Sequence, residues 1–337
     1  MLARDTGRRS RQFTFVKFLW AVVGSICYPA AMPKSPLALW RDRRGRVSAL
    51  RIGTLLLLLV PILLAVLAAF SDQGFGARPL NDLIHRAGYW TLMFVLLALA
   101  VTPLARIGRF GALMDVRRMI GVGAFCYAAT HITLYIADQM FDLTKVASEI
   151  ALRLYLTIGF TALIGLAVLA ATSTDGWVRR LRAQRWMRLH RFLYAVTLLA
   201  LIHFFQQTKA DVWVPTFFAG LFTWLMGYRL LVWWRQPKGQ LSAWSLLALA
   251  VAVSALTFAG EAIGIGIAYG VSPLMVLQMA FEVDYDTISP GWLVLAAGLC
   301  VVALDLVRGW WRKPRRTANE PARPAAGRTP KSAPEAV

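Results

Sequence analysis

The sequence predicts an all-α fold, a polytopic bundle of transmembrane helices. Of its 337 residues, 58% are hydrophobic. Several apolar runs are each long enough to cross a bilayer, which takes about 20 helical residues. The formal net charge is +20, but the Lys and Arg residues lie in short segments between the apolar runs. Such a distribution is better explained by membrane orientation than by nucleic-acid binding. These features argue against a soluble fold and against a nucleic-acid partner.

Eight apolar runs qualify as crossings, and each is flanked by charges or turn residues. They cover 52–70, 88–105, 119–137, 152–172, 190–207, 213–234, 242–260 and 291–308. The first six form a core over residues 52–234, and the last two form an addition within 235–308. Residues 1–51 form a basic N-terminal region, in which the apolar stretch 13–32 is expected to be an interfacial or re-entrant helix. Residues 309–337 are expected to be a disordered cytoplasmic tail.

The loop charges predict the orientation. Segments 106–118 and 179–191 carry four and six arginines, which places both in the cytoplasm by the positive-inside rule. Segments 138–149 and 261–286 are mainly acidic and are therefore assigned to the periplasm. Residues 262–280 are apolar, but a ninth crossing there would place the acidic stretch 282–286 in the cytoplasm and the arginine-rich tail outside. An extended or re-entrant periplasmic helix is therefore expected. The chain is thus predicted to be a multi-pass inner-membrane protein with both termini in the cytoplasm.

Three of the four histidines, His131, His190 and His203, lie within or at the end of predicted spans. Ionisable side chains are rare in membranes and usually mark a cofactor, an ion path or a proton relay. The alternative is a neutral histidine that is bonded to a neighbouring helix. The third and fifth spans both begin at a cytoplasmic arginine cluster and are therefore parallel. His131 lies 13 residues after Arg118, and His203 lies 13 residues after His190.

At about 1.5 Å per residue, His131 and His203 therefore reach nearly the same depth. Two facing imidazoles can hold one haem iron, and a site closed on both faces favours electron transfer. His131 and His203 are accordingly predicted to be the iron ligands of a b-type haem.

Arg118 and His190 share a second level, about 20 Å nearer the cytoplasm. A second haem bound there by His190 would take its other axial ligand from Arg117, Arg118, another side chain, water or nothing. Because arginine stays protonated, Arg117 and Arg118 are better suited to pair with a haem propionate or a flavin phosphate. The expected cofactors are one or two haem b groups, with FMN as a further candidate. Alternatively, His190 is an interfacial histidine among arginines.

The geometry of an ideal helix raises one objection. Thirteen residues leave His190 and His203 about 140° apart around the helix axis, so two haems would need a distorted helix or approaches from different sides. The fourth histidine, His85, falls in the predicted loop 71–87. It is expected to be a surface or capping residue, with contact to a periplasmic partner as the alternative.

At these residues the sequence resembles the MsrQ (YedZ) family, the haem-binding membrane subunits of periplasmic protein-methionine-sulfoxide reductase systems, within the ferric-reductase-like transmembrane superfamily. The matching segments are "GARPLNDLIHRAG", "VTPLARIGRF" through "RRMIGVGAFCYAATHITLY", and "RLYLTIGF" through "ATSTDGWVRRL", "RWMRLHRFLYAV" and "LIHFF". The resemblance covers residues 70–235 and departs from the compact six-helix form at both ends. It implies a six-helix core in which His131, His190 and His203 are haem ligands.

The resemblance also implies a route for electrons, from a cytoplasmic reduced-flavin source to a periplasmic molybdopterin-containing (MsrP-like) methionine sulfoxide reductase that repairs oxidised periplasmic proteins. No soluble flavin or nicotinamide domain is recognised, so the electrons are expected to arrive from a flavin reductase or from reduced flavin. The chain would then be an electron-transfer subunit of an oxidoreductase complex, surrounded by membrane lipid. The alternatives are a ferric or quinone reductase of the same superfamily and a non-haem transporter with a histidine proton relay.

Overall fold

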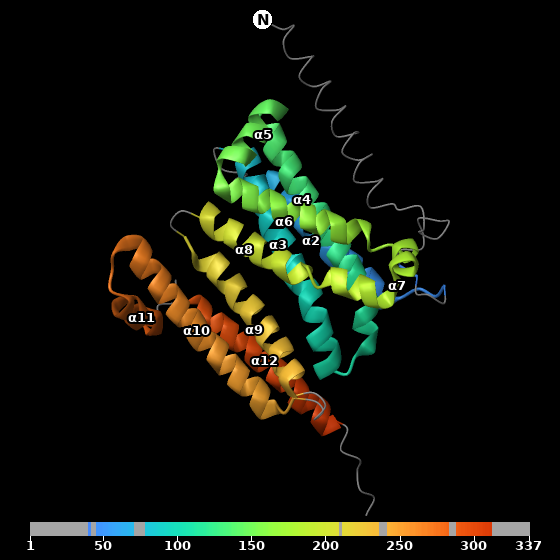
Figure 1. The fold of residues 1–337 in the computed structure, drawn as a ribbon. Coiled ribbons are helices and arrows are strands. Elements are labelled where there is room, and N and C mark those ends of the chain that lie inside the picture. Colours follow the sequence, from blue (N-terminus) through green and yellow to red (C-terminus); the bar gives the residue numbers. More distant parts are fainter. Residues whose placement is uncertain are drawn as a thin grey trace, which may run out of the picture.

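The computed structural model describes residues 40–41, 45–70, 78–208, 211–235, 241–282 and 288–311. Eight spans within these ranges are long and apolar enough to cross a membrane, which confirms the number and place of the predicted crossings. The spanning helices are α2 (Ala49–Ala69), α3 (Pro79–Ile107), α4 (Arg117–Asp138), α6 (Leu154–Ala171), α7 (Asp175–His190) continuing into α8 (Leu193–Gln207), α9 (Trp213–Arg235), α10 (Ala243–Tyr269) and α12 (Pro290–Trp311) (Figure 1). The expected helix at 13–32 and the tail from 312 onward lie outside the described residues.

In the described connections between the spans there are three shorter elements: η2 (Gly111–Asp115), α5 (Leu143–Leu152) and α11 (Pro273–Phe281). With 9 residues, α11 is too short to cross a bilayer. It follows α10, which ends at Gly270 in the left-handed conformation (φ 67°) that favours glycine. The apolar stretch 262–280 is therefore an extension of α10, a turn and a short helix.

Two segments that were expected to be loops are helical. Residues 179–191 fall mostly in α7, so the arginine-rich segment is helical on both sides of a kink at Arg182 (φ 60°). The helix begins at the N-cap Thr174, whose side chain accepts a hydrogen bond from the Trp177 amide. The predicted loop 71–87 is also shorter than expected. The helix α3 begins at Pro79, a residue that suits the first helical position, and His85 lies in its second turn.

The central helix of the bundle is α3. One face packs with α4, α6 and α8 in a cluster that includes Phe94, Phe125 and Leu166. The opposite face contributes to a second cluster with α8, α9, α10 and α12, which includes Leu99 and Phe218. By contrast, α2 exposes most of its large apolar side chains, as expected of a helix that faces lipid.

The helices α10 and α12 lie against α9 on the side of the bundle away from α4 (Figure 1). The buried Ser254 of α10 donates a hydrogen bond to the Gly291 carbonyl of α12 at 2.9 Å. A hydroxyl-to-backbone bond of this kind joins two helices where no water is available. The two added spans thus form one unit with α9.

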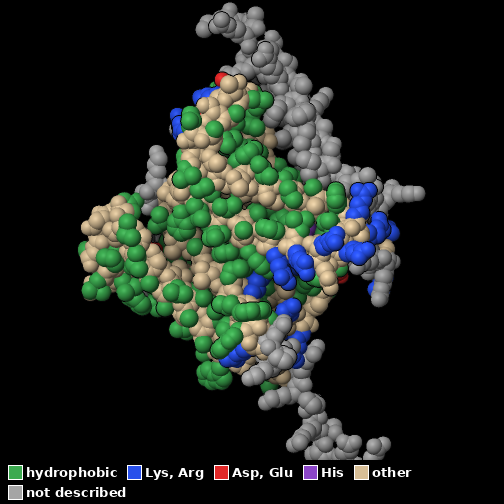
Figure 2. Space-filling model, in the orientation of Figure 1, with side chains coloured by type: hydrophobic (Ala, Val, Ile, Leu, Met, Phe, Trp, Pro, Cys, Tyr) green, Lys and Arg blue, Asp and Glu red, His purple; other side chains and the backbone are tan. Residues whose placement is uncertain are grey.

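The two ends of the bundle differ in charge. One end carries α7 and η2, and we call it the α7 end; the other carries α5 and α11, and we call it the α5 end. On the face shown in Figure 2, most of the Lys and Arg side chains gather over α7 and the neighbouring helix ends, whereas the surface between the two ends is mainly hydrophobic. This is the distribution expected of a membrane protein whose α7 end faces the cytoplasm.

Candidate functional site

The structure brings His131 of α4 and His203 of α8 together in the bundle. Their ring centroids are 6.4 Å apart, and the ring planes are nearly perpendicular, at 84°. Two metal–nitrogen bonds of about 2 Å, together with the two half-rings, span about 6 Å. The spacing of the pair therefore fits one metal ion held between the two imidazoles.

Both rings are oriented by a backbone carbonyl. The Nδ1 atom of His131 lies 2.8 Å from the carbonyl oxygen of Ile84 on α3, and that of His203 lies 2.7 Å from the carbonyl oxygen of Tyr155 on α6. A carbonyl only accepts, so Nδ1 carries the proton and donates in each ring. In a neutral imidazole this leaves the Nε2 lone pair available to a metal.

The two histidines use the same local arrangement. Gly88 follows Ile84 by four residues, and Gly159 follows Tyr155 by four residues, so each glycine lies above the carbonyl that accepts from the histidine. A Cβ atom on Gly88 would lie 3.2 Å from the His131 ring, and one on Gly159 would lie 2.7 Å from Nδ1 of His203. Because glycine has no side chain, each imidazole ring can lie against the neighbouring helix and reach its backbone carbonyl.

The residues around the pair fit a haem better than a bare metal ion. Within the part of the chain that the structure describes, no group of three or more His, Cys, Asp and Glu side chains could hold a metal. A two-histidine site therefore needs further ligands, which a porphyrin supplies through its ring nitrogens.

A cavity of about 580 Å³ lies between the first turns of α3 and the last turns of α8. Its wall includes Tyr89 and Phe204, the chain neighbours of Gly88 and His203. Trp90 adds to the aromatic part, and His85, Arg86 and Asp211 form a polar part. His85 is exposed, as expected of a surface residue, and it also lines this cavity.

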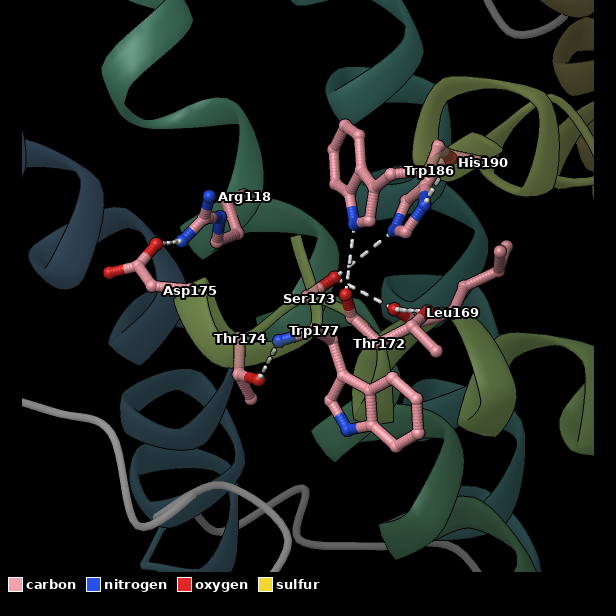
Figure 3. Close-up of polar contacts among 9 residues, drawn as sticks. All are labelled: Arg118, Leu169, Thr172, Ser173, Thr174, Asp175, Trp177, Trp186 and His190. Atoms are coloured by element: carbon pink, nitrogen blue, oxygen red, sulfur yellow. Dashed lines mark hydrogen bonds and ion pairs between the residues drawn. The ribbon is translucent and has the colours of Figure 1, made fainter. Parts of the chain in front are cut away.

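His190 lies away from this pair, at the α7 end, where it is held against the turn between α6 and α7 (Figure 3). Its ring stacks on Trp186 with centroids 3.9 Å apart. Its Nδ1 lies 3.1 Å from the Trp186 carbonyl oxygen, and its Nε2 lies 3.3 Å from the Ser173 hydroxyl, which donates to the Leu169 carbonyl. Unlike the deep pair, His190 has a protein neighbour at each ring nitrogen.

The structure separates the two predicted arginines. Arg118 forms an ion pair with Asp175 at the start of α7, and the two side chains are 38% and 64% exposed (Figure 3). Arg117 is half-buried and lies within electrostatic range of Tyr194 and Arg229. Both arginines are close enough to His190 to interact with it electrostatically. Arg117 therefore faces the bundle, and Arg118 faces the surface.

The ideal-helix angle between His190 and His203 does not apply to this chain. Arg191 and Phe192 form a turn between α7 and α8, with the tighter hydrogen bonds Phe192 N to Leu189 O and Tyr194 N to Arg191 O. Such i to i−3 bonds give about three residues per turn instead of 3.6. His190 and His203 are therefore not carried by one uninterrupted ideal helix.

Several residues of the site were not predicted. Gly88 and Gly159 carry no sequence signal beyond being glycines near the ends of spans. Arg229 does carry one, because it is the only charged residue in the apolar run 213–234, and an isolated charge within a span is a functional candidate.

The family profile for the ferric reductase like transmembrane component matches residues 86–201, a range that contains His131 and His190 and ends two residues before His203. No solved structure matches the chain.

Curated relatives match over a longer stretch. A protein of Xanthomonas campestris pv. campestris (strain 8004) is 43% identical over 165 residues, which are 49% of this chain and 74% of the relative. One of Rhodospirillum rubrum is 38% identical over 195 residues, which are 57% of this chain and 89% of the relative. Both are named protein-methionine-sulfoxide reductase heme-binding subunit MsrQ. The chain therefore belongs to the MsrQ family of ferric-reductase-like membrane proteins.

Proposed function

We propose that this chain is the b-type haem membrane subunit of a protein-methionine-sulfoxide reductase system. It carries electrons from a cytoplasmic donor, a flavin reductase or reduced flavin, across the inner membrane to a periplasmic molybdopterin-containing methionine sulfoxide reductase. The name of its relatives supports haem binding. The observation that carries the proposal is the His131–His203 pair, with both Nδ1 atoms bonded to carbonyls.

In this proposal His131 and His203 hold the iron through Nε2, while the carbonyls of Ile84 and Tyr155 fix the tautomer and the direction of each ring. A bound haem would supply a one-electron iron couple, and the two histidines would hold its iron against binding and activating another ligand. Both rings are half-buried among the surrounding helices. These features favour electron transfer over oxygen chemistry.

Electrons enter at the α7 end. The positive side chains there attract an anionic reduced flavin, and His190 with Arg117 provides for a second cofactor, haem b or FMN. The levels of His190 and His203 differ by about 20 Å, which is most of the roughly 30 Å hydrocarbon core. A cofactor at each level would divide the crossing into two shorter steps. The periplasmic reductase would then take electrons at the α5 end.

The test is an optical spectrum of the detergent-purified protein before and after reduction with dithionite, combined with haem-to-protein stoichiometry. The wild type should show reduced Soret and α-bands. His131→Ala and His203→Ala should each lose the deep haem, whereas His190→Ala should keep it and alter only a cofactor at the α7 end. His85→Ala serves as the histidine control and should retain the deep haem.

A wild type without reduced Soret and α-bands refutes haem binding, and full haem content in His203→Ala refutes the pair. Sealed vesicles test the direction of flow. Membrane-impermeant reduced FMN should reduce the haem in inverted vesicles, in which the cytoplasmic face is outside. Equal reduction in right-side-out vesicles would contradict entry from the cytoplasm.

A further inference from the structure

Arg229 is a cation within the spanning part of α9, and it bonds to three helices. Its Nε donates to the Tyr194 hydroxyl of α8 at 3.2 Å, Nη1 donates to the Leu225 carbonyl of α9 at 2.7 Å, and Nη2 donates to the Leu99 carbonyl of α3 at 2.6 Å. All three acceptors are neutral. The side chain is half-buried at this position.

The bond to α3 has a local cause. In a helix the Leu99 carbonyl would accept from the amide of the residue four positions later, and that residue is Pro103. Proline has no amide hydrogen, so the carbonyl is left without its usual donor inside the membrane. Arg229 supplies the missing donor, which fixes the guanidinium between α3, α8 and α9.

The positive charge of Arg229 is not paired with a carboxylate within 4.0 Å among the described residues. Neither Arg229 nor Arg117 takes part in an ion pair within 4.0 Å, and Arg117 makes no hydrogen bond to any residue that the structure describes. The two arginines are nevertheless close enough to repel each other electrostatically. Two neighbouring cations at least partly removed from water are costly unless an anion joins them.

The hydrogen-bonding capacity points the same way. A guanidinium has five N–H donors, and Arg229 uses three, so two remain. The Tyr194 hydroxyl accepts from Arg229, and its own hydrogen has no acceptor in the described part of the chain. Arg117 has all its donors left. The cluster therefore has spare donors and positive charge, and no carboxylate of the described residues forms an ion pair with either arginine within 4.0 Å.

We propose that Arg117 and Arg229, together with the Tyr194 hydroxyl, form a binding site for an anionic oxygen group of the cofactor at the α7 end. The group is a carboxylate or a phosphate, because both match the planar donor fork of arginine. A haem propionate and a flavin phosphate are the two sources of this chemistry. Arg118 is outside the site, since it pairs with Asp175 at the surface. The inference rests on the proposed function, which provides the cofactor.

The experiment measures haem content, FMN content and the midpoint potential of each haem in purified protein. Arg229→Gln should weaken the binding of the cofactor at the α7 end at least tenfold. If the haem stays bound and the variant favours the oxidised over the reduced haem tenfold more than the wild type does, the midpoint potential of that haem should fall by about 59 mV. The deep haem at His131 and His203 should keep its spectrum, which also reports that the bundle is folded.

Three further variants separate charge from structure. Arg229→Lys keeps the charge but not the fork, so it should restore much of the potential, whereas a purely structural role would not be rescued. Tyr194→Phe leaves the bond to Leu99 intact and should produce a smaller shift in the same direction. Arg235→Gln is the matched control, because Arg235 lies on the same helix, is exposed and donates to Ser245; it should change nothing.

The outcomes distinguish the sources and the premises. Altered haem content or potential indicates a propionate, whereas lost FMN with unaltered haems indicates a phosphate. Wild-type cofactor content and potentials in both Arg229→Gln and Arg117→Gln would overturn the anion site while leaving the proposed function intact. A wild type with neither haem nor FMN would instead refute the proposed function.

Discussion

Replacing Gly159 with alanine tests how His203 is held. The added Cβ would lie 2.7 Å from Nδ1 of His203, which is 0.7 Å short of the 3.4 Å at which ordinary contact begins. The ring must move by about this distance, or α6 and α8 must separate. The atom that is displaced is the one that donates to the Tyr155 carbonyl at 2.7 Å, so the orienting bond is lost as well.

The expected size follows from these two effects. Inserting a methyl group into a packed site costs about 1–3 kcal/mol, and loss of a partner that orients a metal ligand lowers metal affinity about 10–100-fold. Gly159→Ala should therefore lose haem or its low-spin signal. Haem per protein by pyridine haemochromogen and low-spin electron paramagnetic resonance are the measurements.

Two alanine variants provide a graded comparison. The Cβ of Gly88→Ala would lie 3.2 Å from the His131 ring, only 0.2 Å short of ordinary contact, and that of Gly121→Ala on α4 would meet nothing within 4 Å. Haem retention should therefore follow the order Gly121→Ala, Gly88→Ala, Gly159→Ala. Wild-type haem content and an unchanged low-spin signal in Gly159→Ala would refute the placement of His203 against α6.

Three other changes have defined outcomes. Arg118→Ala removes an exposed ion pair with Asp175, so the free energy of unfolding should change by at most about 1 kcal/mol. Reduction of the protein by reduced FMN should slow, and it should slow more at low than at high salt. A rate that does not depend on salt would contradict electrostatic steering of the flavin. Trp186→Phe keeps an aromatic ring for stacking but loses the indole donor, and thermal unfolding should show a loss of about 1 kcal/mol with the deep haem retained. Tyr127→Phe removes a 2.6 Å bond to the Leu58 carbonyl of α2, so hydrogen exchange in α2 should increase without loss of haem, and unchanged exchange would show that lipid alone holds this helix.

The parts of the fold that follow from length were predictable. The bilayer thickness sets the length of a span, so the eight crossings could be read from apolar runs. The rise per residue likewise placed His131 and His203 at one level, and the structure has their rings 6.4 Å apart. Depth along an axis depends only on counting residues, and this is why it could be inferred.

The direction in which a side chain points around its helix axis could not be inferred in the same way. It depends on kinks such as the left-handed Arg182 within α7 (φ 60°) and on the turn at 191–192. The carbonyls that orient the histidines lie 47 and 48 residues away in sequence, and only packing of α3 on α4 and of α6 on α8 brings them close. The different surroundings of Arg117 and Arg118 have the same origin, because adjacent helical residues point to different sides.

The bond between Arg229 and the carbonyl exposed by Pro103 bears on how the chain enters the membrane. Among the eight spans, α9 has the lowest mean hydropathy, 1.2, and an arginine within a span opposes insertion, by up to about 2.5–3.5 kcal/mol at the helix centre. Synthesis releases α3 and α8 before α9, so the acceptors on Leu99 and Tyr194 already exist when Arg229 emerges. We expect α9 to leave the translocation channel by joining these helices rather than by partitioning alone into lipid, which makes the order of the helices along the chain a condition for biogenesis.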